Sequence, residues 1–123
     1  MIEGAVNAAS QAVVVLSLRG PSGRTLEVEA VVDTGFDRFL TLPPRVVAEL
    51  DLAFVGLNSV QLADGSEAAL DSYAVTVLWD GRPRRVVTYV SDAAPLVGMA
   101  LLAGHSLCVD VEPGGRVAIE SAA

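Results

Sequence analysis

The segment 31–37 places a carboxylate, a hydroxyl and a glycine at the end of an apolar strand. Two valines lead into Asp33, and the chain then turns at Thr34 and Gly35. A carboxylate that a bend exposes at the end of a buried strand can act as a general acid or base. No other aspartate is followed by Thr-Gly or Ser-Gly. We therefore interpret Asp33 as a candidate catalytic carboxylate; an aspartate that caps a turn between two strands is the alternative.

Length and composition predict one domain with a core of its own. A chain of 123 residues fits a single domain over 1–123, with the core at about 12–119. The 52% of apolar residues occur in short runs, none long enough to span a membrane. The N-terminus lacks the basic and apolar regions of a secretory signal. We therefore expect a cytoplasmic protein that has no membrane partner.

The charged residues exclude several kinds of site. The net charge is −7, and all eight basic residues are arginines. Without lysine the chain has neither a Walker-type phosphate lysine nor a Schiff-base lysine. The acidic balance disfavours nucleic acid as a partner, because that binding depends on neutralising phosphates. The one basic cluster, 82–85, follows the turn Asp80-Gly81 and is interpreted as a solvated hairpin end, with a binding site as the alternative.

Cysteine and histidine occur once each, so the sequence excludes an intrachain disulfide and leaves a zinc site short of ligands. Cys108 lies between Leu107 and Val109, and we predict that it is a small buried apolar residue instead of the nucleophile of a Cys–His pair. His105 follows Gly104 and is predicted at a turn or a helix end. We expect no metal and no cofactor.

Short apolar runs separated by turn signals predict an all-β sandwich or barrel. They amount to about seven or eight short strands and at most two short helices, one of them over 45–50 and the other after Gly98. The principal strands are expected over residues 12–18, 26–32, 39–42, 58–63, 68–79, 84–90, 107–111 and 116–119, and 95–98 begins as a strand that the glycine breaks. Asp64-Gly65 and Asp80-Gly81 mark tight hairpin turns.

In their order along the chain, these elements resemble the retropepsin-like aspartic proteases, specifically the short bacterial single-domain members. The resemblance covers roughly residues 12–119. The catalytic triplet of the family is matched by Asp33, Thr34 and Gly35. The flap that closes over substrate in the family is matched by the hairpin turn of Ala63, Asp64, Gly65 and Ser66. The element of two hydrophobes and a glycine that packs beside the triplet is matched by Leu96, Val97 and Gly98, and the following helix by 99–102.

The resemblance implies a closed or partly open β-barrel with one lobe per chain and a homodimer that hydrolyses peptides or proteins. In aspartic proteases two carboxylates about 3 Å apart share one proton, because both cannot ionise at that distance. Asp33 would meet Asp33 of the partner subunit on the two-fold axis. The Thr34 hydroxyl would bond across the axis, and Gly35 would bring its backbone close to the site.

The resemblance also implies a substrate cleft, with some departures from the family pattern. The cleft residues are Asp37, Phe36, Leu96, Val97 and Gly98. Phe36 stands where many relatives have a small residue, Met99 stands where retroviral members have an arginine, and Asp64 makes the flap tip acidic instead of glycine-rich. The alternative is therefore a catalytically silent dimerisation or peptide-binding module with the same fold. A monomeric β-barrel that binds a small molecule is a third hypothesis.

Overall fold

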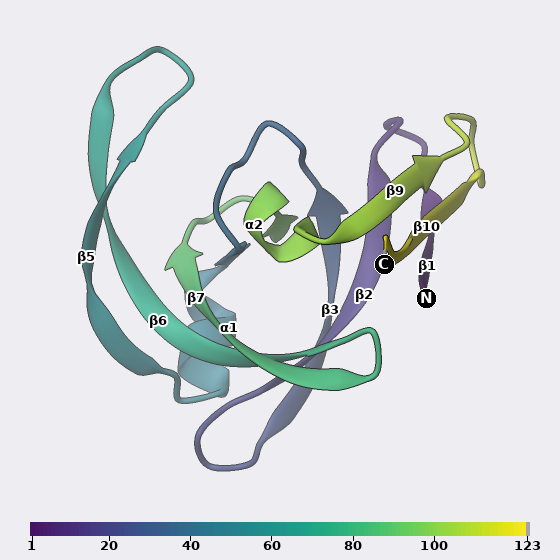
Figure 1. The fold of residues 1–123 in the computed structure, drawn as a ribbon. Coiled ribbons are helices and arrows are strands. Elements are labelled where there is room, and N and C mark those ends of the chain that lie inside the picture. The colour runs from purple at the N-terminus through teal and green to yellow at the C-terminus, as the bar shows by residue number, and fades with distance from the viewer. Residues whose placement is uncertain (123) are drawn as a thin grey trace.

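A computed structural model describes residues 1–122 of the chain, and within them lie ten strands and two short helices (Figure 1). The first half contains β1 (Ile2–Val6), β2 (Ala12–Arg19), β3 (Thr25–Val32), β4 (Leu40–Leu42), α1 (Pro44–Glu49) and β5 (Ala53–Gln61). The second half contains β6 (Glu67–Trp79), β7 (Arg82–Val90), β8 (Leu96–Val97), α2 (Met99–Leu102), β9 (His105–Val109) and β10 (Arg116–Ser121).

All ten strands belong to one sheet that curls into a ring. Their order is β5-β6-β7-β4-β8-β3-β2-β1-β10-β9, and β6 also pairs with β2. That additional pairing closes β2, β3, β8, β4, β7 and β6 into a barrel, while β5 and β9 remain as free edges. The predicted all-β fold, a closed or partly open barrel with one or two short helices, is confirmed, and its ring is closed.

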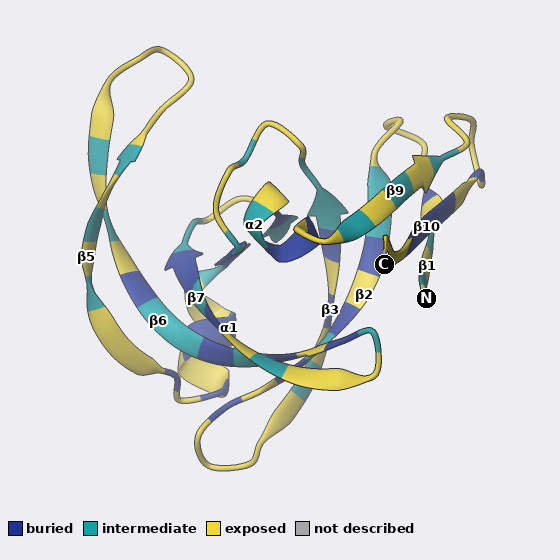
Figure 2. Cartoon of the chain, viewed as in Figure 1, coloured by how far each residue is buried: buried dark blue, intermediate teal, exposed yellow. Residues whose placement is uncertain are grey.

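The core lies inside this ring, because side chains of a strand alternate between its two faces. In β2, Leu16 and Leu18 are at most 2% exposed, whereas Val15 between the strand's inward residues is 55% exposed. Burying a leucine side chain stabilises the fold by about 1.5–3 kcal/mol. In Figure 2 dark blue segments are interspersed with exposed or intermediate ones along the strands of the barrel, and the tip of the β5–β6 hairpin is exposed throughout.

Both predicted helices are present, close to their predicted ranges. Pro44 is the first residue of α1, where its fixed φ and missing N–H cost nothing, and Val46 and Val47 pack inward. The helix begins one residue before the predicted range 45–50. α2 is a single turn that follows Gly98 and stops before Gly104, whose φ is +82°. Within residues 1–122 neither helix has the length and apolarity needed to cross a membrane.

The chain ends form strands that were only partly predicted. β1 was missed, and the core extends past the predicted limits of 12–119, since Val6 is 4% exposed. β1 pairs with β10 through Ile2 and Ile119, and its other edge meets β2. The C-terminal segment folds back on the same chain as a β9–β10 hairpin. Including these, the sheet has more strands than the seven or eight expected.

The prediction for Cys108 is wrong. β9 places Leu107 and Val109 against the core, so the intervening Cys108 must point outward, and it is exposed. His105 begins the same strand directly after the turn, close to its predicted place. Its ring meets that of the buried Trp79 edge to face, with centroids 5.7 Å apart.

Candidate active site

The Asp33 turn follows β3 directly. The backbone N–H of Asp33 donates to the carbonyl of Val97 at 2.9 Å, and the N–H of Phe36 donates to the carbonyl of Asp33 at 3.2 Å. The Oδ1 atom of Asp33 accepts the N–H of Gly35 at 2.9 Å. Its other carboxylate oxygen accepts no hydrogen bond from residues 1–122. Asp33 is half-buried, whereas Thr34 and Gly35 are exposed.

The two-residue strand β8 joins the strands on either side of this turn. It pairs in parallel with β3, where Val32 lies opposite Val97, and antiparallel with β4, where Leu40 lies opposite the same valine. The predicted packing of the element 96–98 beside the triplet is therefore present. Val97 is fully buried between the two strands, so β8 fixes both the entry and the exit of the loop 33–39.

Gly98 brings the start of α2 against this loop. The N–H of Gly98 donates to the carbonyl of Phe39 at 3.0 Å, and the N–H of Met99 donates to that of Phe36 at 2.7 Å. A Cβ on Gly98 would lie 2.1 Å from the carbonyl oxygen of Arg38 and 2.6 Å from Cδ2 of Phe36. Only glycine permits an approach this close. The Phe36 ring, a departure from the family pattern, thus packs on the glycine that holds the loop.

The second acid of the segment points into solvent. The side chain of Asp37 is 90% exposed, and its Oδ1 lies 3.7 Å from Nε of Arg38. Arg38 also reaches the buried Tyr89: its Nη1 is 3.4 Å from the phenolic oxygen and its guanidinium lies 5.9 Å from the ring centre. Sequence reasoning did not single out Arg38, because nothing local links it to a tyrosine on β7.

One hydroxyl group and one arginine also support the loop, and the sequence did not identify them. Thr41 Oγ1 accepts the N–H of Leu96 at 3.0 Å. The guanidinium of Arg84 lies 5.5 Å from the centre of the Phe39 ring and donates to the carbonyl of Leu101, in α2, at 3.2 Å. The interpretation of 82–85 as a solvated hairpin end is therefore wrong for Arg84, which is half-buried between α2 and the loop.

The hairpin of β5 and β6 extends away from the barrel (Figure 1). Its turn is the predicted one, and Ala63, Asp64, Gly65 and Ser66 are all exposed. The N–H of Leu62 donates to the carbonyl of Ser66 at 2.7 Å, and the N–H of Gly65, with φ at +86°, donates to that of Leu62 at 2.9 Å. The loop is thus a three-residue turn with glycine in the left-handed region.

Asp64 braces this turn, and its protonation should loosen the tip. Hydrogen bonds from the Ser66 hydroxyl and then the Ser66 N–H hold the pKa of the Asp64 carboxyl below its usual range. The stabilisation is present above the ordinary pKa of about 3.9 and is lost as pH falls through the lowered value. We expect the Ser66 amide chemical shift to titrate with a midpoint below about 3.9.

The variant Asp64→Asn is the control for this titration, since its side-chain oxygen can still accept from Ser66 without titrating. Its Ser66 amide shift should lack the transition. A midpoint in the wild type at or above the ordinary value would contradict the bracing role of Asp64.

The base of the hairpin is bent at a β-bulge that one buried hydroxyl fastens. The register of β5 and β6 shifts between Phe54 and Gly56, where φ is +147°. Ser72 Oγ, fully buried on β6, donates to the carbonyl of Gly56 at 2.8 Å and accepts from Nδ2 of Asn58 at 2.8 Å. This pair of bonds fixes the angle at which the hairpin leaves the barrel.

Removing that hydroxyl should destabilise the protein. Ser72→Ala leaves the Gly56 carbonyl and the Asn58 amide without their partner, which costs about 1–3 kcal/mol. Urea unfolding measures the change. The control is Ser59→Ala on β5, which removes a hydroxyl that bonds an exposed Glu67 at 3.3 Å and should change stability by less than about 0.5 kcal/mol. Equal losses in the two variants would show that the buried hydroxyl does not fasten the bulge.

Among residues 1–122 no group of three or more histidine, cysteine, aspartate or glutamate side chains is arranged to hold a metal ion.

Comparisons with known proteins identify the fold. No family model and no curated protein matches the sequence. Among solved structures, the chain is similar to a retropepsin-like aspartic protease from Rickettsia conorii, with 18% identity, a TM-score of 0.60, and 99% of this chain and 91% of that chain covered. It is also similar to the EIAV protease complexed with an inhibitor, with 17% identity, a TM-score of 0.58, and 78% and 88% covered. The chain therefore has a retropepsin-like fold.

Proposed function

We propose that the protein is a homodimeric aspartic endopeptidase whose catalytic pair is Asp33 from each of two copies. The observation that carries the proposal is the placement of Asp33: it follows β3, and its turn is bonded to β8 and Gly98 on a retropepsin-like fold. Hydrogen bonds that fix the backbone around Asp33 suit a catalytic carboxylate, because catalytic groups must be held in position before the reaction begins.

One chain holds only half of this site. The Asp33 carboxylate takes part in no ion pair within residues 1–122, and Thr34 and Gly35 beside it are exposed. A second copy related by a two-fold axis would supply the second carboxylate without a second motif. In this dimer the Thr34 hydroxyl bonds across the axis and Gly35 lets the two turns approach.

The chemistry needs one proton on the pair. The ionised carboxylate removes a proton from a water molecule as the water oxygen attacks the peptide carbonyl carbon, and the protonated carboxyl donates to the carbonyl oxygen. The resulting gem-diol intermediate breaks its C–N bond when the nitrogen receives the proton that came from water, and one hydroxyl of the intermediate returns its proton to the other carboxylate as the C=O bond reforms. Two products leave, a carboxylic acid and an amine, and the pair again holds one proton.

Other predicted residues have places in the same proposal. Asp37 and Phe36 follow the triplet and, with the half-buried Leu96, border the cleft in which an extended peptide binds. Val97 and Gly98 are buried, so they hold the triplet in place from beneath instead of lining the cleft as predicted. The β5–β6 hairpin acts as the flap. Leu62, 45% exposed at the turn, offers an apolar contact to the substrate, and Ser72 sets the angle of the hairpin.

One observation favours the second candidate, a silent dimerisation or peptide-binding module. The bond from Gly35 N–H to Asp33 Oδ1 is the one that a turn-capping aspartate makes, so the turn can form without any catalytic role. This module would dimerise and bind peptides but would not cleave them.

The test couples self-association to activity. Sedimentation velocity should detect a dimer that grows between low and high micromolar concentration, and cleavage of a denatured protein should increase with the dimer fraction. Activity per chain therefore rises with concentration until dimerisation saturates. A protein that stays monomeric at high micromolar concentration, or whose activity per chain is constant while it is monomeric, would rule out the shared pair.

A further inference from the structure

The outer face of the barrel carries a row of two arginines with a threonine between them. Arg19 on β2 lies opposite Thr76 on β6, and Thr76 lies opposite Arg85 on β7. Residues directly opposite in antiparallel strands share a face, and this is the outer one, because Val75 and Val77 of β6 face the core. Three hydrogen-bonding side chains from three strands thus lie side by side.

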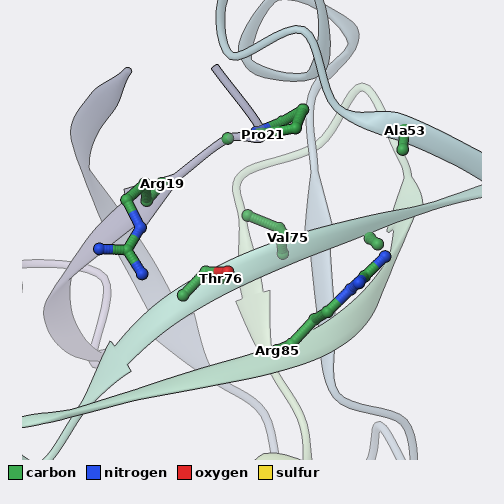
Figure 3. A pocket seen from close by; sticks show the side chains of 8 residues that line it. Arg19, Pro21, Ala53, Val75, Thr76 and Arg85 are labelled. Carbon is green, nitrogen blue, oxygen red and sulfur yellow. The ribbon is translucent and has the colours of Figure 1, made fainter. Parts of the chain in front are cut away.

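The row borders a cavity. Neighbouring strands lie about 4.8 Å apart, so the Cα atoms of Arg19 and Arg85 are roughly 10 Å apart, within reach of one bound group. The cavity, of about 140 Å³, is far larger than the roughly 10–15 Å³ that one water molecule requires. Figure 3 shows Arg19 and Arg85 on either side of Thr76. The remaining lining residues are Gly20, Pro21, Ala53, Ala74 and Val75.

Both arginines lack a protein partner. Within residues 1–122 neither Arg19 nor Arg85 forms a side-chain hydrogen bond or an ion pair. Four of the eight arginines, Arg24, Arg38, Arg84 and Arg116, do bond other groups, and the two remaining ones, Arg45 and Arg82, do not line this cavity. The residue opposite Arg19 on β3 is Thr25, and the nearest acid of that strand, Glu27, lies opposite Ser17. Two cations thus face one cavity in a protein of net charge −7.

We infer that this cavity is a binding site for a phosphate group. Each guanidinium presents a planar fork of donors that matches two phosphate oxygens, and the Thr76 hydroxyl can donate to a third. A phosphate dianion also offsets the repulsion between the two cations, which a single carboxylate does only in part. The shared chemistry is that of inorganic phosphate and phosphate monoesters.

This site is separate from Asp33. Val13 on β2 lies opposite Val31, two residues before Asp33, and Arg19 is six residues further along the strand. Arg19 is thus eight residue positions from the level of Asp33, which at about 3.3 Å per residue places the cavity roughly 26 Å from the triplet. Phosphate binding there is independent of the proposed peptidase activity, so either can fail without the other.

The test is a titration of the ¹⁵N-labelled protein with inorganic phosphate, with ionic strength held constant by sodium chloride. The amide signals of Arg19, Thr76 and Arg85 should shift and saturate. Arg19→Gln and Arg85→Gln should each weaken binding at least ten-fold, and Thr76→Val several-fold. Acetate should bind more weakly than phosphate, and a parallel titration with phosphoserine tells whether a monoester also enters the cavity.

The matched control is Arg45→Gln, which removes the same charge from an exposed position of α1 that does not line the cavity and should leave binding unchanged. Arg19→Lys keeps the charge and loses the fork, so it should bind phosphate less tightly than the wild type while preserving the fold. Shifts that never saturate, or equal weakening by Arg45→Gln and Arg85→Gln, would show that phosphate only screens surface charge and would overturn the inference.

Discussion

Asp33→Asn is expected to abolish peptide cleavage while the protein still folds and dimerises. The amide oxygen of asparagine can accept the Gly35 N–H as Oδ1 of the aspartate does, so the turn keeps its geometry. An amide cannot take a proton from water, and general acid–base catalysis contributes about 10²–10⁴-fold in rate. We expect cleavage of a denatured protein to fall by roughly 10³-fold or more, with an unchanged sedimentation profile.

Two further variants make this result specific. Asp110→Asn removes one acid from an exposed position after β9 and should keep wild-type activity. Asp33→Ala removes the cap of the turn as well as the carboxylate, so it should lose stability that Asp33→Asn retains. Wild-type cleavage by Asp33→Asn would refute the catalytic role of Asp33 and favour the silent module. A wild-type protein that dimerises but cleaves no peptide would also refute the catalytic role of Asp33 and favour the silent module.

The local features of the fold could be predicted from the sequence. Proline at the start of α1 and glycine after α2 fix helix ends through their own φ angles, which needs no information about distant residues. The same holds for the turn at Asp64 and Gly65. The triplet and its partner element 96–98 could also be paired in advance, but only through resemblance to a family, since nothing in the spacing of 33 and 98 predicts contact.

The parts that could not be predicted depend on contacts between distant segments. β1 has alternating burial, but its Gly4 weakens the pattern of a strand, and its principal partner β10 lies more than a hundred residues away. Cys108 was misplaced because Leu-Cys-Val is apolar throughout, so the sequence does not show which residue faces outward. Only the packing of Leu107 and Val109 decides that.

The polar groups that support the loop also could not be predicted, because they too depend on contacts between distant segments. Arg84 belongs to a run of arginines, and only the position of α2 selects it to bond Leu101. Nothing in the sequence distinguishes Thr41 from other strand threonines. Its role depends on β8, which lies beside it and whose Leu96 N–H donates to the Thr41 hydroxyl. A candidate catalytic residue can therefore be recognised from its neighbours in sequence. The groups that hold it in place can be identified only from the folded structure, because they come from distant segments.

Gly98→Ala is expected to cause a large loss of stability, because this glycine sets the position of the Asp33 loop. The added methyl would lie 2.1 Å from the carbonyl oxygen of Arg38 and 2.8 Å from that of Phe36. Both atoms are backbone, so the clash cannot be relieved by a side-chain rotation, and the loop or α2 must move. Overpacking costs about 1–3 kcal/mol and occasionally more. We expect a loss of about 3 kcal/mol in urea unfolding, or roughly 10 °C in Tm, together with loss of cleavage.

Two variants separate this positioning role from general sensitivity of the region. Met99→Ala changes the next residue, which is 48% exposed, and should cost less than about 0.5 kcal/mol. Gly35→Ala places its methyl 3.2 Å from Oδ1 of Asp33 and near no other group, so it should lower cleavage with little change in stability. If Gly98→Ala instead folds as stably as the wild type and cleaves normally, the contact between Gly98 and the loop does not position Asp33. We expect Gly98→Ala to lose stability and Gly35→Ala to keep it, with cleavage reduced in both. That result would show that Gly98 positions the loop and that the Asp33 carboxylate on the loop performs the chemistry.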